Sequence, residues 1–384
     1  MKTIHRIFFE NSKNMGNIPQ ESVELVVTSP PYPMIEMWDE LFSRQDTRIG
    51  KALKDKNGLL AFELMHKELD VVWNEVWRVL KEGGIVCINI GDATRTVKGN
   101  FMLYPNHSRI VSHMLETGFS PLPEILWRKQ TNAPNKFMGS GMLPAGGYVT
   151  LEHEYILIFR KGKKREFIKD IDKTNRRKSS FFWEERNTWF SDIWTDLKGT
   201  FQNLSDDKVR KRSAAFPFEI PYRLINMFSV KGDTVLDPFL GTGTTTFAAM
   251  AACRNSIGYE LEEGLQGLIS SQMQNIISYS NKLISSRIEN HSYFIKERAK
   301  KGTTFKHINN YYKFHVITKQ ERELILNELI SARQSDENNI EIDYLDISQD
   351  EFYINIENYS ETETMNKISP ESKENMGIQL SFLE

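Results

Sequence analysis

Residues 235–245 read VLDPFLGTGTT, a short apolar run followed by a turn with two glycines. The apolar run predicts a buried strand, and residues 244–253 have the pattern of a helix. Gly241 and Gly243 allow a ligand to approach the backbone at the amino end of that helix. A strand, a glycine turn and a helix in this order indicate a nucleotide-binding α/β fold.

The acidic residues beside this turn narrow the choice of ligand. No lysine follows the glycines as in a phosphate-binding P-loop, and the third glycine of the dinucleotide fingerprint is missing. Glu260 ends the next predicted strand, at 256–260, where its carboxylate can accept both hydroxyl protons of a ribose, and Asp237 suits an amino group. S-adenosylmethionine carries these groups and a sulfonium cation, but no phosphate. A tight turn capped by threonine, with no ligand, is the alternative.

The rest of the chain up to about residue 300 also alternates between strands and helices. Further strands are predicted at 23–28, 85–90, 124–128 and 155–159, and helices at 59–80, 219–229 and within 261–300. Gly83-Gly84 is expected to end the helix at 59–80. This alternation predicts an α/β fold with a doubly wound, mostly parallel sheet.

Residues 28–32 read TSPPY and follow a predicted strand directly. The loop would lie at the carboxyl edge of the sheet, where open α/β folds bind ligands. A nucleobase amine is a poor nucleophile, so its two hydrogens must be held by acceptors. The Ser29 hydroxyl and the Pro30 carbonyl can serve, with Pro31 fixing the backbone and Tyr32 stacking on a flipped-out base. A proline-rich turn that binds another protein is the alternative.

The formal charge of −2 hides a strong asymmetry along the chain. Residues 335–384 hold 13 acidic and 2 basic side chains, whereas residues 160–178 alone contain ten Lys or Arg. Such a basic segment can neutralise nucleic-acid phosphates, although a solvated loop is the alternative. The candidate DNA-binding cations are Lys161, Lys163, Lys164, Arg165, Arg176, Arg177 and Lys178.

The two motifs together resemble the signatures of DNA amino-methyltransferases of restriction-modification systems. The catalytic motif precedes the cofactor motif by some 200 residues, which is the permuted order of the β class of that family. Residues 214–221, AAFPFEIP, are similar to the family segment that packs around the methionine end of S-adenosylmethionine. The resemblance implies that the cofactor contacts Asp237, Pro238, Phe239, Gly241, Gly243, Thr244, Glu260, Phe216 and Pro217.

The resemblance also implies a domain organisation. The sheet would be seven-stranded, Rossmann-like and circularly permuted. Residues 1–162 would form the catalytic half, 163–213 a target-recognition region and 214–265 the cofactor-binding half. Residues 266–384 would form a helical extension, which becomes a loose acidic tail beyond about 335.

Ser29 in place of Asp or Asn is typical of family members that methylate cytosine N4. The implied substrate is therefore a cytosine flipped out of double-stranded DNA, and the implied functional partner is a cognate restriction endonuclease. Adenine-N6 methylation is the alternative, because a serine hydroxyl could serve either base. An RNA or protein amine methyltransferase, or an inactive DNA-binding homologue, is a more distant alternative.

Composition excludes several other classes of protein. No apolar run of 18 residues occurs, and the amino terminus lacks a secretory signal, so we expect a cytoplasmic protein with no membrane partner. Cys87 and Cys253 are far apart in sequence, which predicts neither a disulfide framework nor a metal cluster. Residues 379–383, QLSFL, resemble peptides that dock on sliding clamps, with a chance match as the alternative.

Overall fold

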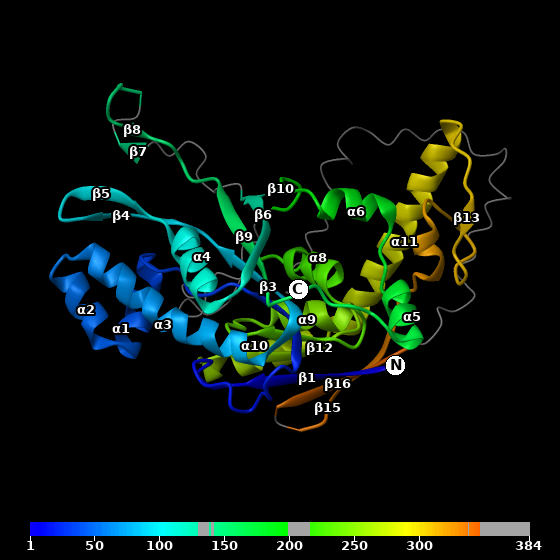
Figure 1. Cartoon of the computed structure of the whole chain (residues 1–384), viewed down its shortest axis with the longest axis horizontal. Helices are drawn as coiled ribbons and strands as arrows, with labels where there is room; N and C mark the ends of the chain where they lie inside the picture. Colours follow the sequence, from blue (N-terminus) through cyan, green and yellow to red (C-terminus); the bar gives the residue numbers. More distant parts are fainter. Residues whose placement is uncertain (130–137, 140–141, 199–215, 337, 346–384) are drawn as a thin grey trace.

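The computed structural model describes residues 1–129, 138–139, 142–198, 216–336 and 338–345. Over these ranges the main sheet has ten strands, in the order β10-β6-β9-β3-β2-β11-β12-β1-β16-β15 (Figure 1). Its parallel centre consists of β3 (Leu80–Ile90), β2 (Val23–Thr28), β11 (Thr234–Asp237), β12 (Asn255–Tyr259) and β1 (Lys2–Phe8). Antiparallel β9 (His153–Arg160) joins β3 to β6 (Ser120–Arg128). The mostly parallel sheet is thereby confirmed.

Three strands extend the sheet beyond the seven that were expected. Strand β10 (Ile193–Trp194) pairs with β6 at one edge, and β16 (Asn339–Tyr344) and β15 (Leu329–Gln334) lie beyond β1 at the other. The expected loose tail beyond about residue 335 is corrected for Asn339–Tyr344, because β16 pairs antiparallel with β1. The rest of that expected tail, 346–384, with the clamp-like peptide at 379–383, lies outside the described residues. The residues of β16 that face the core are apolar or aromatic: Ile340, Ile342 and Tyr344.

Helices cover both faces of the sheet. Alternate residues of a buried strand point to opposite faces, so each strand packs against helices on both sides. In β2, Val26 packs in the same core as α3 (Gly58–Val79) and α4 (Asn106–Thr117), whereas Leu25 packs with α8 (Glu219–Phe228) and α9 (Thr244–Ala251). The doubly wound arrangement is thereby confirmed. Helix α3 ends at Val79, so the expectation that Gly83-Gly84 ends it is corrected: both glycines lie within β3.

The remaining elements lie around this core. They are η1 (Glu36–Trp38), α1 (Asp39–Gln45), α2 (Thr47–Lys54), β4 (Ala93–Val97), β5 (Asn100–Tyr104), β7 (Met138–Gly139), β8 (Gly147–Tyr148), α5 (Asp170–Lys178), α6 (Trp183–Trp189), η2 (Glu263–Leu265), α10 (Gln266–Met273), α11 (Ile276–Lys300), β13 (His307–Ile308), β14 (His315–Val316) and η3 (Lys319–Glu323). In the part of the chain that the structure describes, no helix combines the length and the apolar character needed to cross a bilayer.

The 163–213 segment and the extension both add strands to the main sheet, although β13 and β14 of the extension also form a two-stranded sheet of their own. Strand β10 comes from the 163–213 segment, and β15 and β16 come from the extension, so both segments contribute to the main sheet. The extension is helical in α10 and α11, as expected, but it also supplies these strands. Glu185 of α6 forms a buried, two-pronged ion pair with Arg287 of α11, with N–O distances of 2.6 and 2.7 Å. This pair fixes the 163–213 segment against the extension.

Candidate active site

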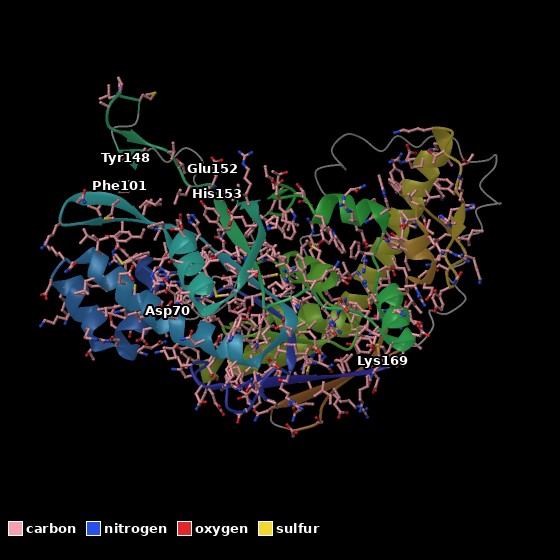
Figure 2. The ribbon with its side chains drawn as sticks, viewed as in Figure 1. Asp70, Phe101, Tyr148, Glu152, His153 and Lys169 are labelled. Atoms are coloured by element: carbon pink, nitrogen blue, oxygen red, sulfur yellow. The ribbon has the colours of Figure 1, made fainter. Side chains whose placement is uncertain are left out.

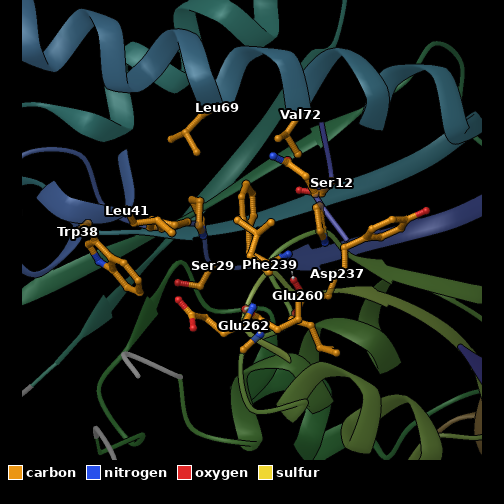
Figure 3. A pocket seen from close by; sticks show the side chains of 18 of the residues that line it. Ser12, Ser29, Trp38, Leu41, Leu69, Val72, Asp237, Phe239, Glu260 and Glu262 are labelled. Atoms are coloured by element: carbon orange, nitrogen blue, oxygen red, sulfur yellow. Dashed lines mark hydrogen bonds between the residues drawn. The ribbon is translucent and has the colours of Figure 1, made fainter. Parts of the chain in front are cut away.

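A pocket of about 410 Å³ lies at the carboxyl ends of β2 and β11 and is lined by both sequence motifs (Figure 3). The two strands are parallel neighbours, so the loops that follow them emerge side by side. The lining includes these residues predicted from sequence: Ser29, Pro30, Pro31, Phe216, Asp237, Pro238, Phe239, Gly241, Thr244 and Glu260. Three other predicted residues are not part of the lining: Tyr32, Pro217 and Gly243.

The Asp237 carboxylate connects the two motifs. Its Oδ1 accepts a hydrogen bond from Thr28 Oγ1 at 2.6 Å, and its Oδ2 accepts one from Thr245 Oγ1 at 2.6 Å. The backbone N–H of Phe239 also donates to Oδ1, at 3.0 Å. Burial raises the pKa of Asp237 to about 6. Since Oδ2 accepts only one of these bonds, it retains a lone pair for the expected amino group.

Glu260 stands directly after β12 with both of its carboxylate oxygens oriented by the backbone. The N–H of Gly241 donates to Oε2 and the N–H of Glu262 donates to Oε1, each at 2.8 Å. Burial raises the pKa of this carboxyl. A carboxylate can accept about four hydrogen bonds, so Glu260 retains capacity for a further hydroxyl donor such as that of a ribose.

A chain of hydrogen bonds leads away from Ser29 into the protein. Ser29 Oγ lies 3.3 Å from the Tyr32 hydroxyl, which donates to Glu154 Oε2 at 2.8 Å. Asn89 Nδ2 donates to both the Tyr32 hydroxyl and Glu154, and Lys129 Nζ donates to Glu154 Oε1, each at 2.8 Å. Burial and the neighbouring Glu154 raise the pKa of Tyr32 well above its usual value. Tyr32 is thus held by its hydroxyl as a neutral phenol.

Sequence reasoning missed the members of this chain beyond Tyr32. Asn89 is the penultimate residue of β3 and Glu154 is the second residue of β9, so each lies far along the chain from Ser29. The available signal was a polar or acidic residue inside an otherwise apolar strand, because such a residue needs a partner when it is buried.

Other side chains of the pocket carry no motif. Trp38 and Leu41 come from η1 and α1, Leu69 and Val72 from α3, and Ser12 from the loop after β1. These residues come together only when the chain folds. Nothing in the sequence pattern around them distinguishes them from ordinary core residues.

The basic segment lies at the other edge of the sheet. Arg165 forms an ion pair with Asp233, with N–O distances of 2.6 and 3.0 Å, and Asp233 directly precedes β11. Asp233 therefore lies at the amino edge of the parallel strands, whereas Ser29 and Asp237 lie at their carboxyl edge. In Figure 2, Lys169 of this segment lies far from His153, which begins antiparallel β9 at the carboxyl edge.

Lys161, one of the predicted DNA-binding residues, is engaged inside the protein in this structure. The side chain is buried, and Nζ donates to the carbonyls of Trp77 and Leu80 at 2.8 Å each. Arg177 is also engaged, through Nε to Glu323 at 3.0 Å. The other predicted cations at this edge are exposed, or half-buried in the case of the last: Lys163, Lys164, Arg176 and Lys178. The structure does not bring any of the seven to the pocket.

Comparisons with known proteins agree with this geometry. Residues 23–271 match the family model described as DNA methylase. The chain is 51% identical to the type II methyltransferase M.MthZI of Methanothermobacter thermautotrophicus over 91% of this chain and 97% of that protein. It is 52% identical to the type II methyltransferase M.MjaI of Methanocaldococcus jannaschii over 71% of this chain and 91% of that protein.

A solved structure resembles the same part of the chain. It is that of TTHA0409 from Thermus thermophilus, a proposed DNA modification methylase complexed with S-adenosylmethionine. The two are 32% identical with a TM-score of 0.53, over 69% of this chain and 92% of that one. The pocket formed by the two motifs, the family match and these relatives lead to one conclusion: the chain belongs to the DNA methylase family, as an S-adenosylmethionine-dependent DNA methyltransferase of the N6/N4 class.

Proposed function

We propose that the protein methylates the N4 amine of a cytosine that is flipped out of double-stranded DNA. The observation that carries this proposal is the position of Ser29, whose side chain lines the same pocket as Asp237 and Glu260. A base inside a duplex cannot reach such a pocket, so the target nucleotide must leave the stack. Serine rather than Asp or Asn at this position supports cytosine over adenine.

The direction of the hydrogen bonds indicates how Ser29 acts. The Tyr32 hydroxyl donates its hydrogen to Glu154 Oε2, at 2.8 Å. The Tyr32 oxygen can then accept from Ser29 Oγ, at 3.3 Å. This leaves the lone pairs of Ser29 Oγ free to accept one hydrogen of the base amine, while the Pro30 carbonyl accepts the other.

Both acceptors turn the amine lone pair toward the methyl donor and disfavour its delocalisation into the ring. S-adenosylmethionine supplies a methyl group bound to a positively charged sulfur. After the transfer, the rest of the donor is a neutral thioether. The carbon–sulfur bond breaks as the carbon–nitrogen bond forms, and the methylated amine nitrogen then releases one proton to solvent water. We propose that Asp237 binds the amino group and Glu260 the ribose hydroxyls of the donor, on the geometry given above.

The biological role that we propose is protection of DNA from a cognate restriction endonuclease. M.MthZI and M.MjaI, each more than 50% identical to this chain, are both type II methyltransferases, which supports that role.

The test is direct. Purified protein is incubated with duplex DNA and S-adenosylmethionine labelled in the methyl group, and the DNA is digested to nucleosides for mass spectrometry. We expect labelled N4-methylcytosine. Labelled N6-methyladenine would contradict the base assignment while retaining the reaction, and unlabelled DNA would contradict the activity itself.

A further inference from the structure

We propose that Trp38 forms the aromatic wall against which the extruded base lies, and that the Asp39–Arg95 ion pair positions it. The proposal rests on the proposed function only in requiring that a nucleobase enters this pocket, whichever base it is.

The pocket extends in two directions from Ser29. In Figure 3, Phe239, Asp237 and Glu260 lie on one side of Ser29, whereas Trp38 and Leu41 lie on the other. The first side carries the carboxylates that suit the amino and ribose groups of the methyl donor. The second side is therefore the space left for the methyl acceptor, and Trp38 offers it an indole face.

Tyr32 is less available for this role than its place in the motif indicates. It is not part of the pocket lining, and its hydroxyl is held by Asn89 and Glu154. A Cβ atom on Gly91 would come within 3.0 Å of Tyr32 Cε2, so the ring also packs closely against the Gly91 backbone. Trp38, in contrast, is part of the pocket lining, although the two side chains are both half-buried.

The backbone between the catalytic loop and Trp38 is folded back sharply. The N–H of Ile35 donates to the Tyr32 carbonyl at 3.2 Å, and the N–H of Trp38 donates to the Ile35 carbonyl at 3.0 Å. Met34 between them has a φ of 66°, in the left-handed region that is unfavourable for a residue with a side chain. Such strain is retained where the surrounding structure requires it, often at a functional site. Here it brings η1 back over the pocket.

An ion pair then fixes the segment from the other side. Asp39, next to Trp38, accepts two hydrogen bonds from Arg95 of β4, with N–O distances of 2.9 and 2.7 Å. The two side chains are only 25% and 17% exposed. A two-pronged pair of this kind restricts orientation as well as distance. Arg95 is thus a positioning residue that acts on the base through Trp38.

Substitution of Trp38 tests the wall. We expect Trp38→Ala to lower kcat/KM for DNA roughly 5- to 150-fold, the range that base–aromatic stacking predicts, and Trp38→Phe to retain most of the activity. The Kd for S-adenosylmethionine, measured by calorimetry, should stay within about twofold, which also shows that the variant is folded. Tyr293→Ala, which removes an exposed aromatic side chain on α11, is the matched control.

A second DNA substrate distinguishes two roles for Trp38: a wall that contacts the extruded base, and a wedge that helps to open the duplex. The methylated site is first mapped with the wild-type protein. In the second substrate, an abasic position lies opposite the target base of that site, so the unpaired base leaves the stack at little cost. If Trp38 is a wall, Trp38→Ala loses as much activity on this DNA as on the intact duplex. Recovery on the unpaired base would overturn the proposal, and so would an equal loss of cofactor affinity or an unchanged kcat/KM.

The positioning role has its own signature. Arg95→Gln should lower kcat/KM less than Trp38→Ala does, and the double variant should be no worse than Trp38→Ala alone, since both act on one contact. Additive losses would contradict the role of Arg95. These comparisons require only that the wild-type protein methylates DNA. An inactive wild type would contradict the proposed function rather than the role of Trp38. If the product is methylated adenine, the same variants still test the role of Trp38.

Discussion

At the scale of single residues, Asp237 shows how burial changes the acid–base behaviour of a residue in the candidate site. Burial raises its pKa to about 6, so a substantial fraction is protonated in mildly acidic solution. A protonated carboxyl loses its charge attraction for the positively charged methyl donor. Asp237 therefore makes cofactor binding depend on pH.

We expect the Kd for S-adenosylmethionine to rise about tenfold between pH 7 and pH 5, because binding requires the ionised form. Calorimetry across this range measures it. Asp237→Asn should bind more weakly at pH 7 and lose most of the pH dependence, apart from a contribution of Glu260, whose pKa burial also raises. The same pH dependence in both proteins would contradict the role of Asp237.

Ser29→Ala removes one of the two acceptors for the base amine. We expect kcat to fall about 100-fold, as for other hydrogen-bonding groups that act in the transition state, with the Kd for S-adenosylmethionine unchanged. Single-turnover methylation of duplex DNA gives the rate. If Ser29→Ala instead weakened cofactor binding and left kcat unchanged, the assignment of Ser29 as an acceptor would be wrong.

At the scale of elements, the site is at the carboxyl edge and the basic segment is at the amino edge. We expect DNA to lie over the carboxyl edge, where Arg128 at the end of β6 and Lys198 after β10 are exposed. Arg128→Gln with Lys198→Gln should reduce the slope of log K against log salt by roughly one per charge. Lys164→Gln with Arg176→Gln should leave the slope unchanged.

Filter binding at several salt concentrations measures both pairs of substitutions. A smaller slope for the second pair would show that DNA contacts the basic segment, which is the DNA-binding segment that the sequence predicts. The density of cations in the sequence could not show which edge of the sheet binds DNA. Strand β9 runs antiparallel to β3, so its carboxyl end and residues 160–178 lie away from the pocket. The charge pattern does not reveal this strand direction.

The elements with continuous apolar runs were predictable. β2 and β11 lie where the sequence placed them, because buried parallel strands carry apolar residues on both faces. β1 and β16 were missed because only alternate residues are buried in them. In β16, Glu341 and Asp343 point away from the core and gave the segment an acidic composition, which concealed the alternation with Ile340 and Ile342.

The candidate site was predictable only in part, for a related reason. The two motifs are contiguous, so their residues could be assigned from local chemistry. Trp38 enters the pocket through the left-handed turn at Met34, and Glu154 reaches Tyr32 from a strand 122 residues away. Neither relation leaves a local pattern in the sequence.

At the scale of the whole molecule, two buried histidines make stability depend on pH. Burial lowers the pKa of His5 and of His66 from 6.5 to about 3. A depressed histidine pKa stabilises the fold fully above pH 6.5, and this stabilisation is lost as the pH falls toward 3. Asp237 acts in the opposite sense, because its raised pKa favours the fold as the pH falls from 6 toward 3.8.

We expect the free energy of unfolding to fall by about 2 kcal/mol between pH 7.5 and pH 5.5, with two histidine contributions partly offset by Asp237. Urea unfolding at a series of pH values measures this change. His5→Gln should remove about half of the histidine contribution even if it lowers stability overall. A free energy that does not change over this range would show that the histidines are accessible to protons in the folded state.

The pairing of β1 has a consequence for how the chain is made. Thr3 of β1 bonds the Tyr344 hydroxyl at 2.9 Å, 341 residues later along the chain. At a synthesis rate of about 5–20 residues per second, β1 leaves the ribosome roughly 20 to 70 s before β16 can cover its edge. An unpaired strand edge attracts other chains during such an interval. Strand β1 can therefore be paired along this edge only after β16 has been made, and until then the edge is open to association with other chains.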